Sequence, residues 1–568
     1  MRTLPARWLL QLVMASTLGL AAQNPTPAPP QASASSAKGT DSGRLGKSNS
    51  FDDVVNQAIL QEHRLLGIMR NFKPVVETYI QKMKADRELG AVPKDDQYFL
   101  GRLDLSSEAP VDYSFLEQPG WEHRLKKKIP SVSQAFIPLG FAQAIFPDRS
   151  HFDRENYTFE FVRWEVLGEV RCVVIDVTPH RTSGNSGFFG RIWVEDQDSN
   201  IVRFMGTYTS KSLAAHSFHF DSWRLNVLPR LWLPAFVYTE ESDPRESPSR
   251  GIQFKAQTRL WGYDLQHAGD HKEYTKPSTD MPLSAGATRK EPSQDLSPAL
   301  SEPRPQYYSA EENVVERLQV TGLMAPTGEV DQVLQIVVNN LLITNDLDIA
   351  GVRCRVLLTA PLESFVVGRT IVISRGLLDV MPDESTLAAV LAHELGHIVL
   401  GHSVGSEYAA NSRLSFPDLK TFQELSFRFD ENKEAAADSK GLELLSKSPY
   451  KDKLTNAGLF LQALETRAPQ LPNLIRPHFA NGFASGGLVH KTNPTNSAPK
   501  LEMNRTDQMA ALPLGSRIKI DPWSDRIELT KTKPVRPLSA AEKMPFEVTP
   551  VYPYLKRVSS QERVGISK

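Results

Sequence analysis

The sequence predicts an α+β protein of several domains, with a helix and an antiparallel β-rich region first and a mainly helical region with a small sheet after it. Three observations support this prediction. Residues 95–266 are β-rich runs separated by short turns, a pattern typical of an antiparallel sheet. Residues 267–305 are rich in proline, serine and threonine and indicate a linker. Beyond this linker, apolar residues recur at helical spacing.

The composition is that of an ordinary globular protein. The 568 residues carry a formal net charge of −1, so nothing global indicates a nucleic acid or an anionic membrane as partner. Cys172 and Cys354 lie in strand-like runs of different predicted domains. An exported chain could join them in a disulfide, but two buried free thiols are the favoured interpretation.

The N-terminus has the pattern of a signal peptide. Arg2 and Arg7 precede a mostly apolar run that ends at Leu20. Small residues at 19 and 21 form a cleavage site. The run is shorter than the roughly 20 residues that span a membrane. We therefore expect residues 1–21 to be removed and the mature chain to be exported, periplasmic or secreted, without a transmembrane segment.

Residues 22–50 and 51–94 differ sharply in composition. The first stretch is rich in alanine, proline and serine and predicts a disordered linker. In the second, apolar residues recur near helical spacing from Val54 to Leu65 and again from Val75 to Met83. This spacing predicts a helical segment over residues 51–94.

Residues 95–266 predict a β-rich accessory domain. The runs 157–167 and 169–179 meet at Gly168, which indicates a hairpin. The runs around Trp193 and Asp198 flank another short turn. In outline, this strand pattern resembles the half-barrel domains of outer-membrane lipoprotein-sorting proteins (LolA-like), which implies a half-barrel-like sheet with no catalytic motif.

The stretch LAAVLAHELGHIVLGH, residues 387–402, carries the chemistry of the second region. His393 and His397 are one helical turn apart, about 6 Å along the axis, so both imidazoles can reach one zinc ion at about 2.0–2.1 Å. Glu394 points to a neighbouring angle, within reach of a water on that metal. A buried helix with incidental histidines is the alternative. Burying these polar groups without a metal or partners is costly, which favours the metal site.

A hydrolytic zinc site takes three protein ligands. A third histidine six residues after His397 is ruled out, because Ser403 stands there. His402 lies about 140° around the helix from His397 and is expected to point away from the metal. Glu434, in a later helical pattern, can complete the ligand set, and Asp438 on the same face can accept a hydrogen bond from a ligand imidazole. The alternative for these two acids is a solvated helix face.

The run LLDVMPDESTLAAVLAHELGHIVLGH followed by EAAAD resembles the gluzincin peptidases of the HtpX, prenyl-protease and BepA type. The resemblance covers about residues 310–480. It implies a zincin-like metallopeptidase domain over residues 306–480 and one zinc ion per chain. The proline-rich, mixed composition of the remaining residues predicts a C-terminal extension over 481–568. Some members of the family carry transmembrane helices. Because no transmembrane segment is predicted in the mature chain, this chain is similar to the soluble periplasmic members.

The family's mechanism implies roles for further residues. Glu394 would act as general base beside a zinc ion that polarises the scissile carbonyl. A substrate would pair with the strand region that contains Phe365, Val367, Arg369 and Ile371. A polar residue beyond the second helix would stabilise the oxyanion, and the candidates are His478, His490 and Arg517.

The sequence therefore predicts an exported zinc-dependent endopeptidase. Its substrates would be polypeptides, among them misfolded envelope proteins. The alternative is an envelope protein that binds a client or a lipid, with a latent, autoinhibited zinc domain. In that case His402, or the histidines at 478 and 490, would occupy the open metal position.

Overall fold

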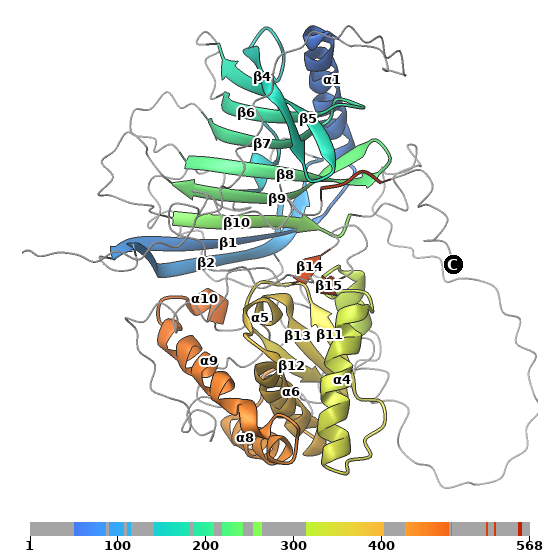
Figure 1. The fold of residues 1–568 in the computed structure, drawn as a ribbon, viewed down its shortest axis with the longest axis vertical. Helices are drawn as coiled ribbons and strands as arrows, with labels where there is room; N and C mark the ends of the chain where they lie inside the picture. The colour runs from blue at the N-terminus through green and yellow to red at the C-terminus, as the bar shows by residue number, and fades with distance from the viewer. Residues whose placement is uncertain are drawn as a thin grey trace, which may run out of the picture. The chain divides into compact units, whose positions relative to one another are not determined.

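The larger sheet of the computed structural model has ten described strands, in the order β3-β2-β1-β10-β9-β8-β7-β6-β5-β4 (Figure 1). Every neighbouring pair is antiparallel, which confirms the predicted antiparallel β-rich region. The strands are β1 (Val75–Asp86), β2 (Gly90–Asp104), β3 (Val111–Ser114), β4 (Tyr157–Leu167), β5 (Val170–Pro179), β6 (Phe188–Glu195), β7 (Ile201–Tyr208), β8 (Phe218–Leu228), β9 (Leu231–Glu241) and β10 (Phe254–Trp261).

The structure describes thirteen stretches of the chain: residues 50–86, 90–106, 111–114, 141–180, 187–208, 218–241, 254–263, 314–402, 427–475, 479, 518–520, 527–529 and 555–558. The predicted signal peptide and both predicted linkers lie outside these residues, apart from Ser50 at the end of the first linker. His478, His490 and Arg517 also lie outside them. Within the described part, no helix is long and apolar enough to cross a membrane.

Both predicted hairpins are present. Leu167 pairs with Val170 across a turn in which Gly168 has a φ of 60°, a conformation that glycine adopts without strain. The turn between β6 and β7 is organised by Glu195, whose carboxylate accepts hydrogen bonds from the backbone nitrogens of Gln197, Asp198 and Asn200. These local bonds fix the register of the two strands.

Helix α1 (Phe51–Met69) packs on one face of the large sheet. Ser50 and Asp53 cap its first turn reciprocally, as in a capping box. Its apolar stripe is buried in one cluster with alternate residues of β5, β6 and β7. Glu62 makes two hydrogen bonds of 2.7 Å to Arg224 of β8, and both side chains are buried, so an ion pair also joins the helix to the sheet.

The prediction of a helical segment over residues 51–94 is wrong beyond Met69. Residues Val75–Asp86 form β1, which lies between β2 and β10. Val75, Val76, Glu77 and Thr78 are all buried, so this part of β1 is covered on both faces. Such a strand shows no alternation of apolar and polar residues, and periodicity alone does not separate it from a buried helix.

The C-terminal half is mainly helical with a small sheet, as predicted. Residues 314–320 are helical. The other helices and strands are α4 (Glu329–Thr344), β11 (Arg353–Leu357), β12 (Ser364–Val367), β13 (Thr370–Ser374), α5 (Arg375–Val380), α6 (Glu384–Val399), α8 (Glu431–Ser446), α9 (Leu454–Arg467), α10 (Pro472–Ile475), β14 (Ile518–Ile520) and β15 (Ile527–Leu529), with the 3-10 turn η3 (Lys451–Lys453). A second 3-10 turn, η2 (Ala142–Ile145), precedes β4 in the N-terminal half.

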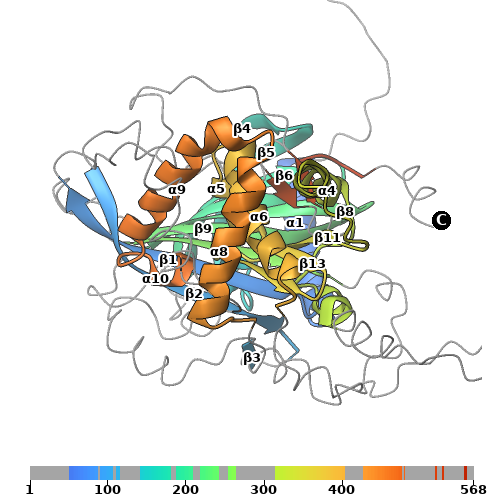
Figure 2. The same cartoon turned by 90° about the horizontal axis from the view of Figure 1, so that it is seen from below.

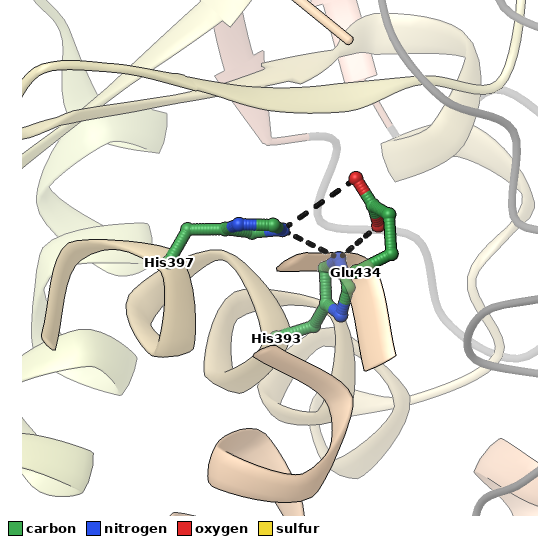
Figure 3. A group of neighbouring side chains, drawn as sticks. All are labelled: His393, His397 and Glu434. Carbon is green, nitrogen blue, oxygen red and sulfur yellow. Dashed lines mark hydrogen bonds and ion pairs between the residues drawn. The ribbon is translucent and has the colours of Figure 1, made fainter. Parts of the chain in front are cut away.

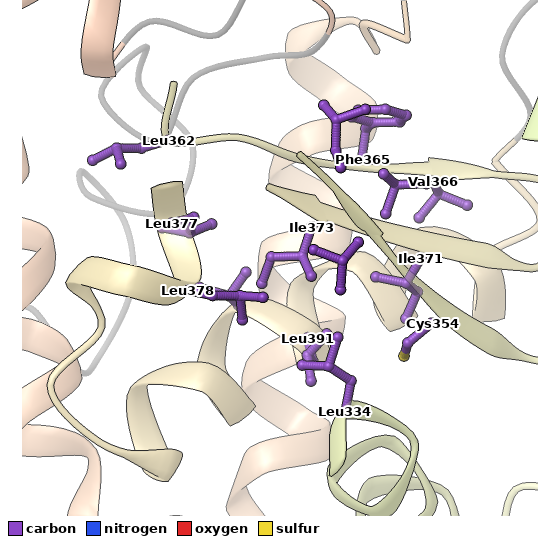
Figure 4. Close-up of a cluster of buried hydrophobic side chains, with 14 of the residues drawn as sticks. Leu334, Cys354, Leu362, Phe365, Val366, Ile371, Ile373, Leu377, Leu378 and Leu391 are labelled. Atoms are coloured by element: carbon purple, nitrogen blue, oxygen red, sulfur yellow. The ribbon is translucent and has the colours of Figure 1, made fainter. Parts of the chain in front are cut away.

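The small sheet has the order β11-β13-β12. Its strands pack on α4, α5 and α6 through one core, in which Leu334, Ile373 and Leu391 are fully or almost fully buried (Figure 4). Cys354 belongs to this core, while Cys172 lies in the large sheet, and both are buried and free. The favoured interpretation of two free thiols is confirmed.

The two sheets are joined by a continuous core within the compact unit Ser50–Lys568. Val75, Tyr98 and Trp261 of the large sheet belong to the same buried cluster as the helices around the small sheet. The indole nitrogen of Trp261 donates a hydrogen bond of 2.7 Å to the carbonyl of Gly322. The β-rich region and the helical region therefore share packed side chains and hydrogen bonds.

Candidate metal centre

The centre is built on α6, which begins at Glu384 after its N-cap Asp383. The carboxylate of Asp383 accepts a hydrogen bond of 2.9 Å from the backbone nitrogen of Thr386, so the residue caps the helix. His393, Glu394 and His397 then fall in the buried part of α6, with exposed fractions of 6%, 4% and 1%. Three ionisable side chains withdrawn from water need partners or a cation.

A glutamate from α8 meets the two histidines, as Figure 3 shows. The Nε2 atom of His393 lies 3.3 Å from Nε2 of His397 and 3.3 Å from Oε2 of Glu434. The Nε2 atom of His397 lies 3.8 Å from Oε1 of Glu434. One ligand atom from each of the three residues lies within 4.8 Å of the others. Within the described stretches, this is the one group of three histidine, cysteine or acidic residues that could hold a metal ion.

These separations fit a zinc ion. Two atoms at about 2.0–2.1 Å from a tetrahedral zinc lie about 3.3 Å apart, close to the spacing of the three ligand atoms here. Burial alone would lower the pKa of His393, but hydrogen bonds to Asp438 and Glu434 outweigh it and raise this pKa to about 10. The surroundings therefore favour a positive charge at the position where the two nitrogens and the carboxylate converge.

Asp438 holds His393 from the side away from Glu434. Its Oδ1 lies 2.7 Å from Nδ1 of His393, and both groups are buried. This contact leaves the Nε2 atom of His393 directed at His397 and Glu434. A carboxylate on the far nitrogen fixes the tautomer and orientation of a ligand imidazole, which is the arrangement expected for Asp438 from its spacing to Glu434.

Helices α6 and α8, both labelled in Figure 2, approach each other closely. A Cβ atom added at Gly396 would lie 2.6 Å from the carbonyl oxygen of Ala437, and one at Gly441 would lie 3.0 Å from the carbonyl oxygen of Ala392. The small residues around Ala437 therefore allow the backbone contact that brings Glu434 and Asp438 to the two histidines.

His402 lies on the other side of His397. The two Nδ1 atoms are 2.9 Å apart, whereas the Nε2 atom of His397 faces Glu434. His402 is therefore placed to orient His397, and it does not reach the position where the three ligand atoms converge. Burial, then the neighbouring His397, lowers the pKa of His402, which favours its neutral form.

Phe429 is a contact of the centre that the sequence did not indicate. Its ring stacks on the imidazole of His397, with centroids 4.2 Å apart and planes 16° from parallel. It precedes Asp430, which caps α8 by accepting hydrogen bonds from the backbone nitrogens of Asn432 and Lys433. A lone aromatic ahead of a helix carries no spacing signal, so sequence reasoning had no basis for finding it.

Glu394 also has a partner that the sequence did not reveal. The hydroxyl of Ser364, the first residue of β12, donates a hydrogen bond of 2.5 Å to Oε1 of Glu394, and both side chains are buried. Burial raises the pKa of Glu394, while charges on His393 and His397 and the bond from Ser364 act to lower it. A carboxyl with a raised pKa is better suited to accept a proton near neutral pH.

The four residues named for the substrate strand fall in different places. Phe365 and Val367 are in β12, which has β13 as its only described neighbour and so forms an edge of the small sheet. Arg369 is in the turn, where its side chain donates to the carbonyl of Ala350. Ile371 is in β13, which is paired on both sides. Among the described strands, β12 therefore has one edge without a partner strand, whereas Ile371 is flanked on both sides.

Two histidines on an HExxH helix and a glutamate from a second helix are the arrangement found in one class of zinc metallopeptidases. Residues 360–422 match the model of Peptidase family M48. This stretch contains both histidines and Glu394 but ends before Glu434. The assignment of Glu434 to the centre therefore rests on the distances from its carboxylate to the two imidazoles. The match confirms the resemblance to these peptidases.

Two solved structures are also similar to part of the chain. A DUF1329 family protein from Desulfovibrio piger is 11% identical, covers 37% of this chain and 94% of that chain, and has a TM-score of 0.19. An outer membrane lipoprotein-sorting protein domain from Vibrio parahaemolyticus is 9% identical, covers 37% of this chain and 92% of that chain, and has a TM-score of 0.20. No curated protein matches the chain.

Proposed function

We propose that the protein is an exported zinc-dependent endopeptidase that hydrolyses polypeptides. The observation that supports this most directly is the convergence of His393, His397 and Glu434 at zinc-ligand spacing, beside the buried carboxylate of Glu394. The match to Peptidase family M48 over the same helix supports it independently.

Glu394 is the general base in this proposal. A zinc ion held by His393, His397 and Glu434 would polarise the scissile carbonyl and acidify a water molecule. Glu394 takes the proton of the attacking water and passes it to the leaving amine. Ser364 occupies one oxygen of the carboxylate, which leaves the other oxygen for the proton. The oxyanion-stabilising group is proposed to be one of His478, His490 and Arg517.

The substrate is proposed to bind along β12 as an added strand. The backbone nitrogen of Ser374 donates to the carbonyl of Glu363, and in an antiparallel pair the bonded positions alternate along the strand. Phe365 and Val367 therefore direct their backbone groups to β13, and Ser364 and Val366 direct theirs to the opposite edge, which has no partner strand in the described part of the chain. Since Ser364 also contacts Glu394, a peptide on this edge would pass the base.

Export and a role in envelope protein quality control complete the proposal. The signal-like residues 1–21 support export to the periplasm or beyond the cell. A substrate that binds through its main chain must be extended, and unfolded or misfolded proteins offer such segments where native ones do not. Misfolded envelope proteins are therefore the proposed substrates.

The test uses the full mature chain and unfolded outer-membrane proteins as substrates, with new peptide termini identified by mass spectrometry. Glu394→Gln should keep one zinc ion per chain, because the ligands are intact, and should lose cleavage by about 100-fold or more. Glu431→Gln, an exposed change on α8, is the matched control. Full cleavage by Glu394→Gln would contradict the proposal. Stable binding without products would favour a client-binding protein instead.

A further inference from the structure

A buried carboxylate of the large sheet contacts the segment that leads to the proposed base. Oε1 of Glu77, in β1, accepts a hydrogen bond of 2.6 Å from the backbone nitrogen of Ala360 and one of 2.8 Å from the hydroxyl of Tyr98. Oε2 of Glu77 pairs with Arg259 of β10. Glu77 is 2% exposed, so this is a contact inside the protein between the large sheet and the loop after β11.

Arg259 holds the same loop at a second point. Its Nη2 donates a hydrogen bond of 2.8 Å to the carbonyl oxygen of Leu358. The ion pair of Glu77 and Arg259 therefore holds two backbone groups of the loop. Arg259 donates to the carbonyl of Leu358, and Glu77 accepts from the nitrogen of Ala360, two residues further on. Burial, then the charge of Glu77, raises the pKa of Tyr98 well above its usual value, so the phenol remains a hydrogen-bond donor to this pair.

The loop is held along the rest of its course to β12. The carbonyl of Thr359 accepts a hydrogen bond of 3.0 Å from the nitrogen of Gly376, and a Cβ atom at Gly376 would lie 1.8 Å from the carbonyl oxygen of Ala360. The carboxylate of Glu363 accepts bonds from the hydroxyl of Thr359 and the nitrogen of Phe479. Glu363 has an exposed fraction of 0%.

The next residue is Ser364, whose hydroxyl donates to Glu394. We infer that Glu77 and Ser364 are positioning residues for Glu394, and that the large sheet thereby sets the geometry of the base. The path runs from Glu77 to Ala360, along the held backbone to Ser364, and from its hydroxyl to Oε1 of Glu394. A displacement of about 1 Å at a reacting group can lower a rate about 100-fold, so a small shift of this loop is sufficient to affect catalysis.

This inference gives the large sheet a role in the reaction and depends on the proposed function only for its kinetic readout. The three proposed ligands lie on α6 and α8, outside the loop. Disturbing Glu77 should therefore change the placement of Glu394 and leave the zinc affinity close to that of the wild type. A general loss of folding would lower both.

The test compares Glu77→Gln with Glu62→Gln in the full mature chain. Both changes weaken a buried ion pair that involves a strand of the large sheet, but Glu62 of α1 bonds to Arg224 and, within the described part of the chain, none of its hydrogen bonds reaches the loop. In the zinc-free protein, hydrogen exchange of residues 359–364 should quicken by about 10-fold in Glu77→Gln and stay at the wild-type rate in Glu62→Gln. This measurement needs no peptidase activity, so it separates the inference from the proposed function.

Kinetics supply the second readout. Ser364→Ala and Glu77→Gln should each lower kcat by about 10-fold with zinc bound, and the double variant should lose little more, because coupled residues are not additive. Ser364→Thr keeps the hydroxyl and should restore most of the rate. If Glu77→Gln does not fold, Tyr98→Phe removes one donor to the same carboxylate and should act in the same direction by about 3-fold. Two results would overturn the inference. One is hydrogen exchange at residues 359–364 that stays at the wild-type rate in Glu77→Gln. The other is a double variant whose loss in kcat equals the product of the losses in Ser364→Ala and Glu77→Gln.

Discussion

Asp438 lies 2.7 Å from Nδ1 of His393, one helical turn after Glu434, which faces Nε2 of the same imidazole. One face of α8 thus contacts both nitrogens of one histidine. Asp438→Asn keeps the shape but loses the charge that makes His393 a better ligand. We expect zinc affinity to fall by about 10–100-fold, measured as a Kd in competition with a chromophoric chelator.

The control for this prediction is Glu431→Gln. Glu431 is exposed on the first turn of the same helix, so its loss changes the charge of α8 by the same amount without touching His393. Its Kd for zinc should stay within about 2-fold of the wild type. Equal Kd values for Asp438→Asn and the wild type would show that the 2.7 Å contact does not influence the metal.

The grouping of these side chains was predictable because each pair follows helical spacing. Glu434 and Asp438 are four residues apart, as are His393 and His397, and helical geometry places each pair on one face. Ser364 was not predictable, since a serine in a strand belongs to no spacing pattern that would link it to Glu394. Glu77 and Ala360 are 283 residues apart, and β1 itself was mistaken for a helix because it is covered on both faces.

The close contact of α6 and α8 gives a stability prediction at Gly396. An added Cβ atom would lie 2.6 Å from the carbonyl oxygen of Ala437, which is backbone and cannot rotate away. Gly396→Ala should therefore lower the free energy of unfolding by about 1–3 kcal/mol and weaken zinc binding, because α8 carries Glu434. Urea denaturation of the zinc-free protein and a zinc titration measure the two effects.

Gly67 is the matched control for Gly396. It lies in the last turns of α1, and an added Cβ atom there meets nothing within 4 Å. Gly67→Ala should raise the free energy of unfolding by about 0.5–1 kcal/mol, because alanine loses less backbone entropy in a helix. If Gly396→Ala and Gly67→Ala changed the free energy of unfolding in the same direction, the proximity of α6 and α8 would not be the cause of the effect at Gly396.

Glu195 gives a prediction about how the stability of the fold changes at acidic pH. Burial would raise its pKa, but hydrogen bonds from Asn200, Arg557 and Gln197 outweigh burial and lower it. A carboxyl whose pKa is lower in the folded state stabilises the fold above its unfolded pKa of about 4.3, and this contribution is lost as the pH falls through the folded value. The difference in stability between the wild type and Glu195→Gln should therefore be largest near neutral pH and shrink below about pH 4.

Urea midpoints measured from pH 7 to pH 3 test this dependence. Glu160→Gln is a suitable comparison, since Glu160 is an exposed residue of β4 and should show no such trend. A stability difference for Glu195→Gln that grows toward acid would reverse the sign and contradict the hydrogen-bond explanation. The carboxylate joins the hairpin turn to Arg557 near the C-terminus, so its protonation should loosen both.

The edge of β12 that has no partner strand among the described residues gives the sharpest prediction about the substrate. Val366 directs its backbone groups away from β13 by the alternation of the antiparallel pair. A proline there removes an outward N–H and keeps the bonds to β13, because proline is tolerated where the N–H of an edge strand faces outward. Val366→Ala loses similar packing but keeps the N–H. With a peptide substrate, Val366→Pro should therefore raise KM by about 10-fold over Val366→Ala, at unchanged zinc affinity. Equal KM values for the two variants would mean that the substrate does not bind as an added strand at this position.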